Sequence, residues 1–428
     1  MSRSSVGAFA AGLLSILAVR TFNPSIHLGG VWSRFLVDAP SQPRRTTSST
    51  HCSNNNHKWK ADFLYESTPE NLGRGVHYLC VTPSSSSSSA SDGVTVIPYI
   101  DAVESSPPEP SFDVQDPDEL MLHLSRLVAA RPDKGRDFKL FDTEGNELFS
   151  ESQLKKGSPS DVLSVLSSAN LVLLFEGGTF IWPGVKLGHR RTVSVGGKNE
   201  SLTLRTLALR PLLYTVEEQF VSDSECDHVQ ERSRPHMKQS GVSLMDKDKG
   251  KKATEWRTSS TYFLPSRRDA VLEGIDSRVE ALTRISKGNQ EQIQVLNYGP
   301  TQKYDGHHDY FDPAMYANDA HTMRMIDGGR RNRIATVFFY LSDVEGGGET
   351  MFFRAHGKRQ PTNLSDCSDG NGLKVKPEKG KVIIFYSLNF DGTVDPYSLH
   401  GGCPVISGEK WSGNKWLWNA PMSFSEYK

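Results

Sequence analysis

The C-terminal half of the chain consists of short apolar runs separated by Gly and Pro, which is typical of a β-rich domain. Between about Thr206 and Lys428 this pattern predicts eight strands, at residues 292–298, 303–311, 333–341, 349–353, 372–375, 381–386, 398–404 and 414–419. Two helices are predicted before most of them, at 222–232 and at 268–286, where apolar residues recur on one face. We therefore expect an α+β fold in which a double-stranded β-helix, or jelly roll, occupies residues 206–428 with supporting helices.

The preceding segment, residues 112–205, mixes two periodicities. Leucines recur at helical spacing over 120–128, and a second helical stretch at 161–169 leads into the apolar run 171–175. We expect a small mixed α/β domain, and the pattern does not indicate its role. Trp182 and His189 are candidate binding residues, but a buried indole and a surface histidine are the simpler interpretation.

Polar tracts dominate the chain before residue 112. Residues 40–57 are rich in Ser, Thr, Asn and Arg, residues 83–93 include six consecutive serines, and residues 105–111 read SSPPEPS. Such compositions do not bury enough apolar surface to form a core. We expect residues 26–111 to be largely disordered low-complexity chain with one short ordered stretch.

The first 25 residues have the pattern of a targeting segment. The apolar run from Val6 to Val19 has the length of a signal-peptide core and is shorter than the ~18 residues of a spanning helix. This favours a signal peptide or a signal anchor, and a signal anchor would attach the N-terminus to the membrane. We therefore expect the protein in the secretory pathway, in the endoplasmic reticulum or the Golgi. The alternative is organelle import, because Arg3, Arg20 and Arg34 precede the first acidic residue, Asp38.

Composition narrows the classes of function. Lys and Arg number 49 against 50 Asp and Glu, giving a formal net charge of -1, so we expect no nucleic-acid partner bound by a broadly basic face. Five cysteines in 428 residues exclude a disulfide scaffold, and none forms a CxxC pair. Cysteine therefore does not indicate the function.

The chemistry is concentrated in the string YDGHHDYF at 304–311. On a strand His307 and Asp309 point to one face while His308 points away. His400, at the end of another predicted strand, would complete two imidazoles and one carboxylate, the facial triad of non-heme Fe(II) oxygenases. An HxD pair alone is weak evidence, since a surface pair or a structural zinc contact also fits. Lys410, ten residues after His400, strengthens the case because an anionic keto-acid co-substrate needs a buried cation.

The segment from about Leu213 to Trp418 resembles the catalytic domain of plant and algal prolyl 4-hydroxylases, which are Fe(II)/2-oxoglutarate-dependent dioxygenases. The resemblance is carried, in family order, by FVSDSECDHV, RTSSTYFL, QVLNYGPTQKYDGHHDYF, NRIATVFFYLSDVEGGGETMF, GLKVKPEKGKVIIFY and DPYSLHGGCPVISGEKWSGNKW. It implies His307, Asp309 and His400 as catalytic iron ligands and Lys410 as the partner of the distal 2-oxoglutarate carboxylate. It also implies that Tyr298 and Thr350 help to hold the co-substrate.

Three further positions correspond to the family's peptide groove: Arg257, Arg333 and Trp416. A surface cation, a strand-end cation and a core indole are the alternative interpretations. Cys367 and Cys403 also stand in family motifs and each could join a disulfide, with the pairing left open.

The implied activity is that of a procollagen-proline 4-dioxygenase-like enzyme, which converts peptidyl proline in a proline-rich substrate to 4-hydroxyproline. It would use Fe(II), 2-oxoglutarate and O2, release succinate and CO2, and bind L-ascorbic acid. One departure concerns substrate choice: the family usually ends KWxH, whereas this chain has Trp418 at the last position, and a long polar stretch, 312–331, stands where the family has a lid. Hydroxylation of another residue or of a small molecule is therefore an alternative, as is a non-catalytic peptide-binding or zinc-holding relative. The oligomeric state is not predicted.

Overall fold

The computed structural model describes residues 57–65, 72–84, 93–103, 109–128, 137–196, 200–368, 370 and 372–422. The expected signal peptide or anchor and the serine tract at 85–92 lie outside these residues. Within the described part of the chain, no helix has the length and apolar character needed to cross a bilayer.

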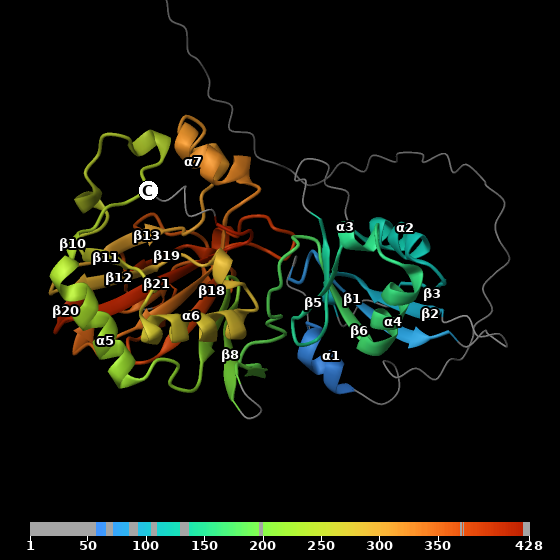
Figure 1. Ribbon diagram of the computed structural model, residues 1–428. Coiled ribbons are helices and arrows are strands. Elements are labelled where there is room, and N and C mark those ends of the chain that lie inside the picture. Colours follow the sequence, from blue (N-terminus) through green and yellow to red (C-terminus); the bar gives the residue numbers. More distant parts are fainter. Residues whose placement is uncertain are drawn as a thin grey trace, which may run out of the picture. The chain divides into compact units, whose positions relative to one another are not determined.

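An antiparallel six-stranded sheet forms the N-terminal part of the described chain (Figure 1). Its order is β3 (Phe112–Val114), β2 (Val94–Tyr99), β1 (Val76–Pro83), β6 (Leu171–Phe175), β4 (Lys139–Phe141) and β5 (Glu147–Ser150). Helices α2 (Pro117–Leu127) and α4 (Pro159–Ala169) contribute apolar residues to a cluster with one face of this sheet. The expected helices and strands of this unit are thus confirmed.

The N-terminal boundary of this unit differs from the expectation. Strands β1 and β2, and the short helix α1 (His57–Phe63), lie in the segment 26–111 that we expected to be largely disordered. The apolar residues at 76–83 and 94–99 are sufficient to form strands because β1 and β2 pair with each other, β2 also pairs with the nearby β3, and β1 pairs with β6, which lies much later in the chain.

A nine-stranded antiparallel sheet forms the main body of the C-terminal part. In order it contains β10 (Lys238–Gln239), β11 (Ser260–Leu264), β12 (Ile293–Tyr298), β21 (Lys410–Trp418), β14 (Arg333–Tyr340), β18 (Val382–Tyr386), β9 (Leu212–Val216), β8 (Ser201–Leu209) and β7 (Arg190–Ser194). Strands β7 and β8 therefore belong to this sheet, although the boundary expected at residue 206 lies after β7 and inside β8. The β7–β8 hairpin extends the sheet through the pairing of β8 with β9.

A smaller four-stranded sheet carries most of the candidate site. It contains β13 (Tyr304–His307), β19 (His400–Gly402), β16 (Thr350–Phe352) and β17 (Leu373–Val375), and β15 (Gly346–Gly347) pairs separately with β20 (Val405–Ser407). All eight predicted strands are present, most of them shorter than predicted. Helices α5 (Asp223–Ser233) and α6 (Ala270–Thr283) confirm the two predicted helices.

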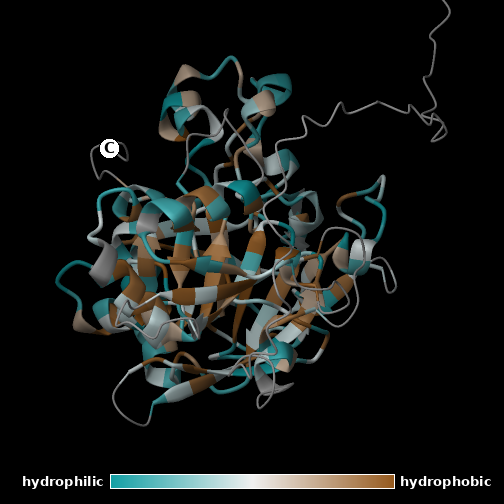
Figure 2. Cartoon of the chain, turned by 90° about the vertical axis from the view of Figure 1, so that its right-hand side faces the viewer, coloured by the Kyte–Doolittle hydropathy of each residue, from teal (hydrophilic) through white to brown (hydrophobic). Residues whose placement is uncertain are grey.

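From Ala335 onward, the alternation of side chains along β14 separates two cores. Ala335, Val337 and Phe339 point into the large cluster that also contains residues of α5 and α6, whereas Phe338 and Tyr340 join a cluster with Phe352 of the small sheet. Figure 1 shows α5 and α6 along one face of the large sheet, and Figure 2 shows hydrophobic strands surrounded by hydrophilic helices and loops. The face opposite the helices is therefore the one that presents side chains to the small sheet.

Candidate metal centre

Two neighbouring strands bring the three sequence-predicted ligands together. His307 ends β13 and His400 begins β19, and the two residues are direct partners in the antiparallel ladder. Asp309 follows β13, and potential ligand atoms of the three residues lie within 4.8 Å of one another. Its carboxylate oxygens are 3.6 Å from the Nε2 atoms of both histidines. These residues form the one such cluster of His, Cys, Asp and Glu found among the described residues.

Backbone carbonyls orient both imidazoles. His307 Nδ1 lies 2.9 Å from the carbonyl oxygen of Asp305, and His400 Nδ1 lies 2.9 Å from that of Ser398. A carbonyl only accepts hydrogen bonds, so each Nδ1 carries the proton and each Nε2 keeps its lone pair. This outer-shell arrangement is the usual one for metal-binding histidines.

The electrostatics favour an ionised carboxylate beside a neutral His400 ring. Burial alone would raise the pKa of Asp309, but His400 and His307 together with Arg333 hold that pKa well below its usual range. Thr336 on β14 donates a 2.6 Å hydrogen bond to Asp309 Oδ2. Burial lowers the pKa of His400 to about 4, with a further contribution from His307. At neutral pH the set therefore offers the negative charge of Asp309 and the neutral nitrogen ligand of His400, which suits a divalent metal.

His308 points away from the triad, as the alternation predicts. Its Nδ1 lies 3.4 Å from Ser398 Oγ, its ring lies beside that of Tyr310, and burial lowers its pKa to about 3. His308 therefore packs behind the site instead of joining it.

Lys410 is a buried cation without a partner. It is 2% exposed, and among the described residues its Nζ contacts only aromatic rings, those of Tyr298, Phe338 and Tyr340 at 5.4–5.9 Å. Burial lowers its pKa to about 7, partly opposed by Glu349. An unpaired buried ammonium is costly, so its position indicates that an anion completes this environment.

Tyr298 and Thr350 lie beside Lys410 and strand β19, which carries His400. Tyr298 is the strand partner of Lys410, and the Tyr298 hydroxyl lies beside Gly402 of β19. Thr350 pairs with Gly402 in the small sheet and accepts a 2.8 Å hydrogen bond from Tyr340. The structure thus brings both expected co-substrate residues to the side of β19 that follows His400.

Arg257 lies against the metal centre from the other side. It is 3% exposed, its Nε donates to Ser259 Oγ at 3.0 Å, and its guanidinium lies over the ring of Tyr304. Tyr304 in turn stacks on His307 with ring centroids 3.7 Å apart. The interpretation of Arg257 as a surface cation is therefore wrong.

Arg333 and Trp416 are in direct contact. The Arg333 guanidinium lies 3.5 Å from the centre of the Trp416 ring, and its Nη1 lies 3.4 Å from the carbonyl oxygen of Asp309. Trp416 is 6% exposed, and its indole nitrogen is buried without a hydrogen-bond acceptor in the described chain. Arg333 thus connects the aromatic end of β21 to the metal-binding segment.

Sequence reasoning missed Glu291, which holds this region together. Its two oxygens accept hydrogen bonds from Arg333 at 2.6 and 3.0 Å, and one oxygen also accepts from Trp418 Nε1 at 2.7 Å. The indole of Trp418 is 1% exposed and packs on Phe311. A lone glutamate before a strand gave no signal in the sequence, because its partners lie 42 and 127 residues away.

The polar stretch 312–331 folds into short helical turns around α7 (Ala320–Met325). Tyr316 and Ile326 from this segment form a cluster with Phe311 and Trp418. The segment expected to act as a lid therefore packs against the aromatic end of β21.

The cysteine pairing that the sequence left open is resolved in part. Cys367 and Cys403 form a disulfide, which ties the loop before β17 to the end of β19, and Cys226 is free and buried. The disulfide fixes the chain three residues after His400.

Comparisons with known proteins point to one family. The family model described as the 2OG-Fe(II) oxygenase superfamily matches residues 293–418. Prolyl 4-hydroxylase 2 of Arabidopsis thaliana is 41% identical over 210 residues, covering 47% of this chain and 66% of that protein. "Probable prolyl 4-hydroxylase 10" of the same plant is 41% identical over 236 residues, covering 53% of this chain and 77% of that protein.

Among solved structures, the viral collagen prolyl hydroxylase of Paramecium Bursaria Chlorella virus-1, in its 2OG complex, is 25% identical and aligns with a TM-score of 0.34. That alignment covers 48% of this chain and 95% of the viral protein. The aligned part of this chain spans just under two thirds of the first Arabidopsis relative and about three quarters of the second.

Proposed function

This chain belongs to the prolyl 4-hydroxylase family of 2OG-Fe(II) oxygenases, and from that premise we propose that it hydroxylates peptidyl proline to 4-hydroxyproline. The reaction uses Fe(II), 2-oxoglutarate and O2 and releases succinate and CO2. The observation that carries the proposal is the convergence of two Nε2 atoms and one carboxylate, with an unpaired buried lysine nearby.

His307, Asp309 and His400 would hold Fe(II) on one face, which leaves the remaining positions open. When bound, Fe(II) supplies the activation of O2, which is coupled to oxidative decarboxylation of 2-oxoglutarate and transfer of one oxygen atom to the acceptor carbon. The contribution of the chain is preorganisation. The carbonyls of Asp305 and Ser398 fix the tautomers, and the hydroxyl of Thr336 fixes the rotation of the Asp309 carboxylate.

Lys410 binds the distal carboxylate of 2-oxoglutarate, with the hydroxyls of Tyr298 and Thr350 around it. A carboxylate in this position accepts hydrogen bonds from the ammonium and replaces the missing anion. The burial of Lys410 also excludes water from this carboxylate site, which strengthens the attraction between the ammonium and the carboxylate.

The two sheets form a jelly roll whose open end takes the peptide. Arg257, Arg333 and Trp416 line this groove, and the segment 312–331 covers it. A proline-rich segment in an extended polyproline conformation is rigid, so it fits an aromatic groove with little loss of entropy.

The cellular setting is also part of the proposal. The N-terminal pattern supports entry into the secretory pathway, to the endoplasmic reticulum or Golgi, with membrane anchoring as one form. The Cys367–Cys403 disulfide supports the same assignment, because disulfides persist in oxidising compartments. Ascorbate serves as the reductant that keeps the iron ferrous.

Incubation of the purified protein with Fe(II), 2-oxoglutarate and proline-rich peptides tests the proposal. We expect succinate and a peptide mass gain of one oxygen atom, located at proline by fragmentation. Succinate without oxidised proline would replace the prolyl assignment with hydroxylation of another residue or of a small molecule, an alternative that Trp418 favours because it occupies the place of the family's groove histidine. No turnover, and no visible absorption band with Fe(II) and 2-oxoglutarate under anaerobic conditions, would indicate a non-catalytic relative.

A further inference from the structure

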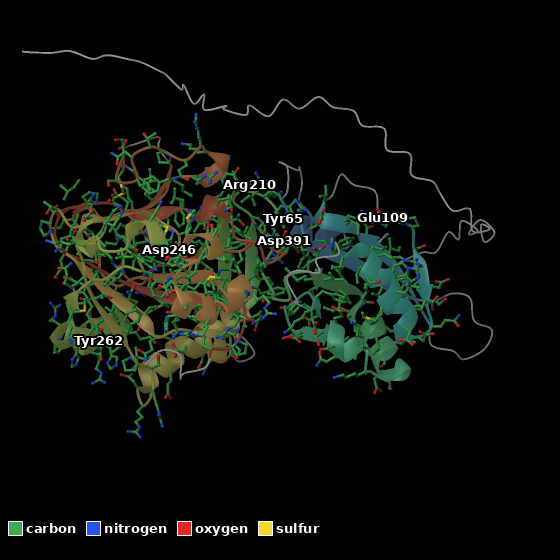
Figure 3. The ribbon with its side chains drawn as sticks, turned by 90° about the horizontal axis from the view of Figure 1, so that it is seen from above. Tyr65, Glu109, Arg210, Asp246, Tyr262 and Asp391 are labelled. Atoms are coloured by element: carbon green, nitrogen blue, oxygen red, sulfur yellow. A yellow bond between two sulfur atoms is a disulfide. The ribbon has the colours of Figure 1, made fainter. Side chains whose placement is uncertain are left out.

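A cavity of about 260 Å³ lies outside the metal centre. It is bounded by the turn before β1, by the β8–β9 turn and by the segment between β18 and β19, and no residue of the metal triad lines it. Figure 3 shows three of its residues, Tyr65, Arg210 and Asp391, beside one another. Drug-sized ligands usually occupy about 300–1,000 Å³, so this cavity suits a molecule of amino-acid size.

Two opposite charges face this cavity without pairing with each other. The Arg210 guanidinium contacts the ring of Tyr397 at 5.3 Å and forms no ion pair within the described chain. The Asp395 carboxylate, in a residue that is 7% exposed, accepts a 2.8 Å hydrogen bond from the Tyr397 N–H and has no cation partner among the described residues. Burial raises the pKa of Asp395 to about 6, and the hydrogen bond from the Tyr397 N–H and the through-space effects of Arg210 and Arg354 oppose this shift.

The other acidic residue of the cavity is engaged locally. Asp391 accepts hydrogen bonds from both the N–H and the hydroxyl of Thr393. The aliphatic part of the lining is contributed by Leu72, Ile181, Leu209, Leu212 and Leu388. The polar part also includes Asn389, Thr393 and a second arginine, Arg74, which is exposed. The cavity therefore combines two arginines, the exposed Arg74 and the half-buried Arg210, with one buried carboxylate, Asp395, and an aliphatic wall.

We propose that this cavity binds a small zwitterion of the α-amino-acid class. Its carboxylate pairs with Arg210, its ammonium group pairs with Asp395, and its compact apolar side chain packs against the leucines. A buried carboxylate such as Asp395 is costly to leave unpaired, and one zwitterionic ligand pairs with it and with Arg210 at the same time. A monocarboxylate or a monoamine would satisfy one residue and leave the other as it is.

The position of the site connects it to the iron ligands. Asp395 caps the turn Pro396–Ser398, and the Ser398 carbonyl accepts the hydrogen bond that orients His400. A ligand on Asp395 therefore contacts the segment that holds one of the two histidines. The inference itself is independent of which substrate the oxygenase hydroxylates.

Isothermal titration of the full metal-free chain tests the proposal with three probes that share one apolar group: L-leucine, 4-methylpentanoate and 3-methylbutylamine. We expect leucine to bind at least tenfold more tightly than either singly charged analogue. Arg210→Gln should reduce leucine affinity to that of the amine and leave amine binding unchanged. Asp395→Asn should reduce leucine affinity to that of 4-methylpentanoate. The amide oxygen of this variant still accepts the hydrogen bond from the Tyr397 N–H. Arg359→Gln removes an exposed charge outside the lining and should change nothing.

Three results would overturn the proposal. One is absence of leucine binding at millimolar concentration, and another is equal affinity for leucine and 4-methylpentanoate, which would define a simple anion site. The third is leucine binding that survives both cavity substitutions but disappears in His307→Ala, which would place the ligand at the metal centre. If Asp395→Asn fails to fold, the analogue series with Arg210→Gln decides the question alone.

Discussion

Replacing Lys410 by Met should weaken the binding of 2-oxoglutarate without reducing the stability of the folded chain. The Lys410 ammonium is buried against three aromatic rings, and burial lowers its pKa from 10.5 to about 7. This difference of about 3.5 pKa units corresponds to about 5 kcal/mol by which burial disfavours the charged form. Truncating one partner of a buried charge pair costs about 2–5 kcal/mol, so the KM for 2-oxoglutarate should rise from roughly 30-fold to several thousand-fold. The ligand-free variant should be at least as stable as the parent, because Met removes a cation without a partner.

The same shift predicts a pH dependence with a definite sign. The clamp needs protonated Lys410, so above pH 7 the binding of 2-oxoglutarate requires uptake of a proton, and its KM should rise by up to tenfold per pH unit. Between pH 7 and 10.5 the unfolded chain holds the proton that the folded lysine has lost. The contribution of Lys410 to the free energy of unfolding of the ligand-free protein therefore increases with pH across this window. Lys410→Arg, which remains charged, should show a KM that no longer rises with pH on account of this residue.

Lys415 provides a matched control on the same strand. It is 1% exposed, lies at the opposite phase of the alternation and pairs with Asp276 of α6. Lys415→Met breaks a buried pair, so it should reduce stability by about 3–5 kcal/mol and leave the 2-oxoglutarate KM unchanged. Succinate formation as a function of 2-oxoglutarate concentration from pH 6.5 to 9, together with thermal unfolding, measures both quantities. A normal KM in Lys410→Met, or the same KM rise with pH in that variant as in the parent, would refute this reasoning.

Three further predictions concern the metal centre and its surroundings. His400→Ala should abolish turnover while circular dichroism shows a retained fold; normal turnover would mean that the triad is misassigned. Thr336→Val, which keeps the shape but removes the O–H donor to Asp309, should weaken Fe(II) binding about 10–100-fold in a metal titration, and unchanged affinity would show that this hydrogen bond is not needed. Glu291→Gln leaves Arg333 without its buried anion, so the peptide KM should rise with the 2-oxoglutarate KM unchanged; the reverse pattern would contradict the assignment of Arg333 to the groove.

The local part of the site was predictable because it depends on the two-residue period of strands. That period placed His307 and Asp309 on one face and turned His308 away, and the structure confirms both. The same alternation places Lys410 and Trp416 on one face of β21 and Lys415 on the other. Short apolar runs bounded by Gly and Pro predicted the strands correctly, although β13 (Tyr304–His307) and β19 (His400–Gly402) are shorter than the predicted ranges 303–311 and 398–404.

Long-range polar partners were not predictable from one sequence. Thr336 stands in the apolar run of β14 and resembles any β-branched core residue, so its hydrogen bond to Asp309 becomes visible only when the two sheets face each other. Glu291 requires both β14 and the end of β21 to be in place before its partners are known. For the same reason β1 was missed, because its partner β6 lies about 90 residues later in the chain and the intervening polar tracts dominated the composition.

The domain boundary expected at residue 206 fails because the hydrophobic core is not divided there. Leu173 and Phe175 of β6 belong to the same buried cluster as Val337 and Phe339 of β14, on the face of the large sheet opposite the metal. Trp182 adds a polar tie, since its indole N–H donates to the carbonyl of Leu282 at the end of α6 at 2.8 Å. The N-terminal sheet and the inner face of β14 therefore belong to one continuous core, together with α5 and α6. The chain just before β1 also supplies one wall of the cavity beside the 395–398 turn.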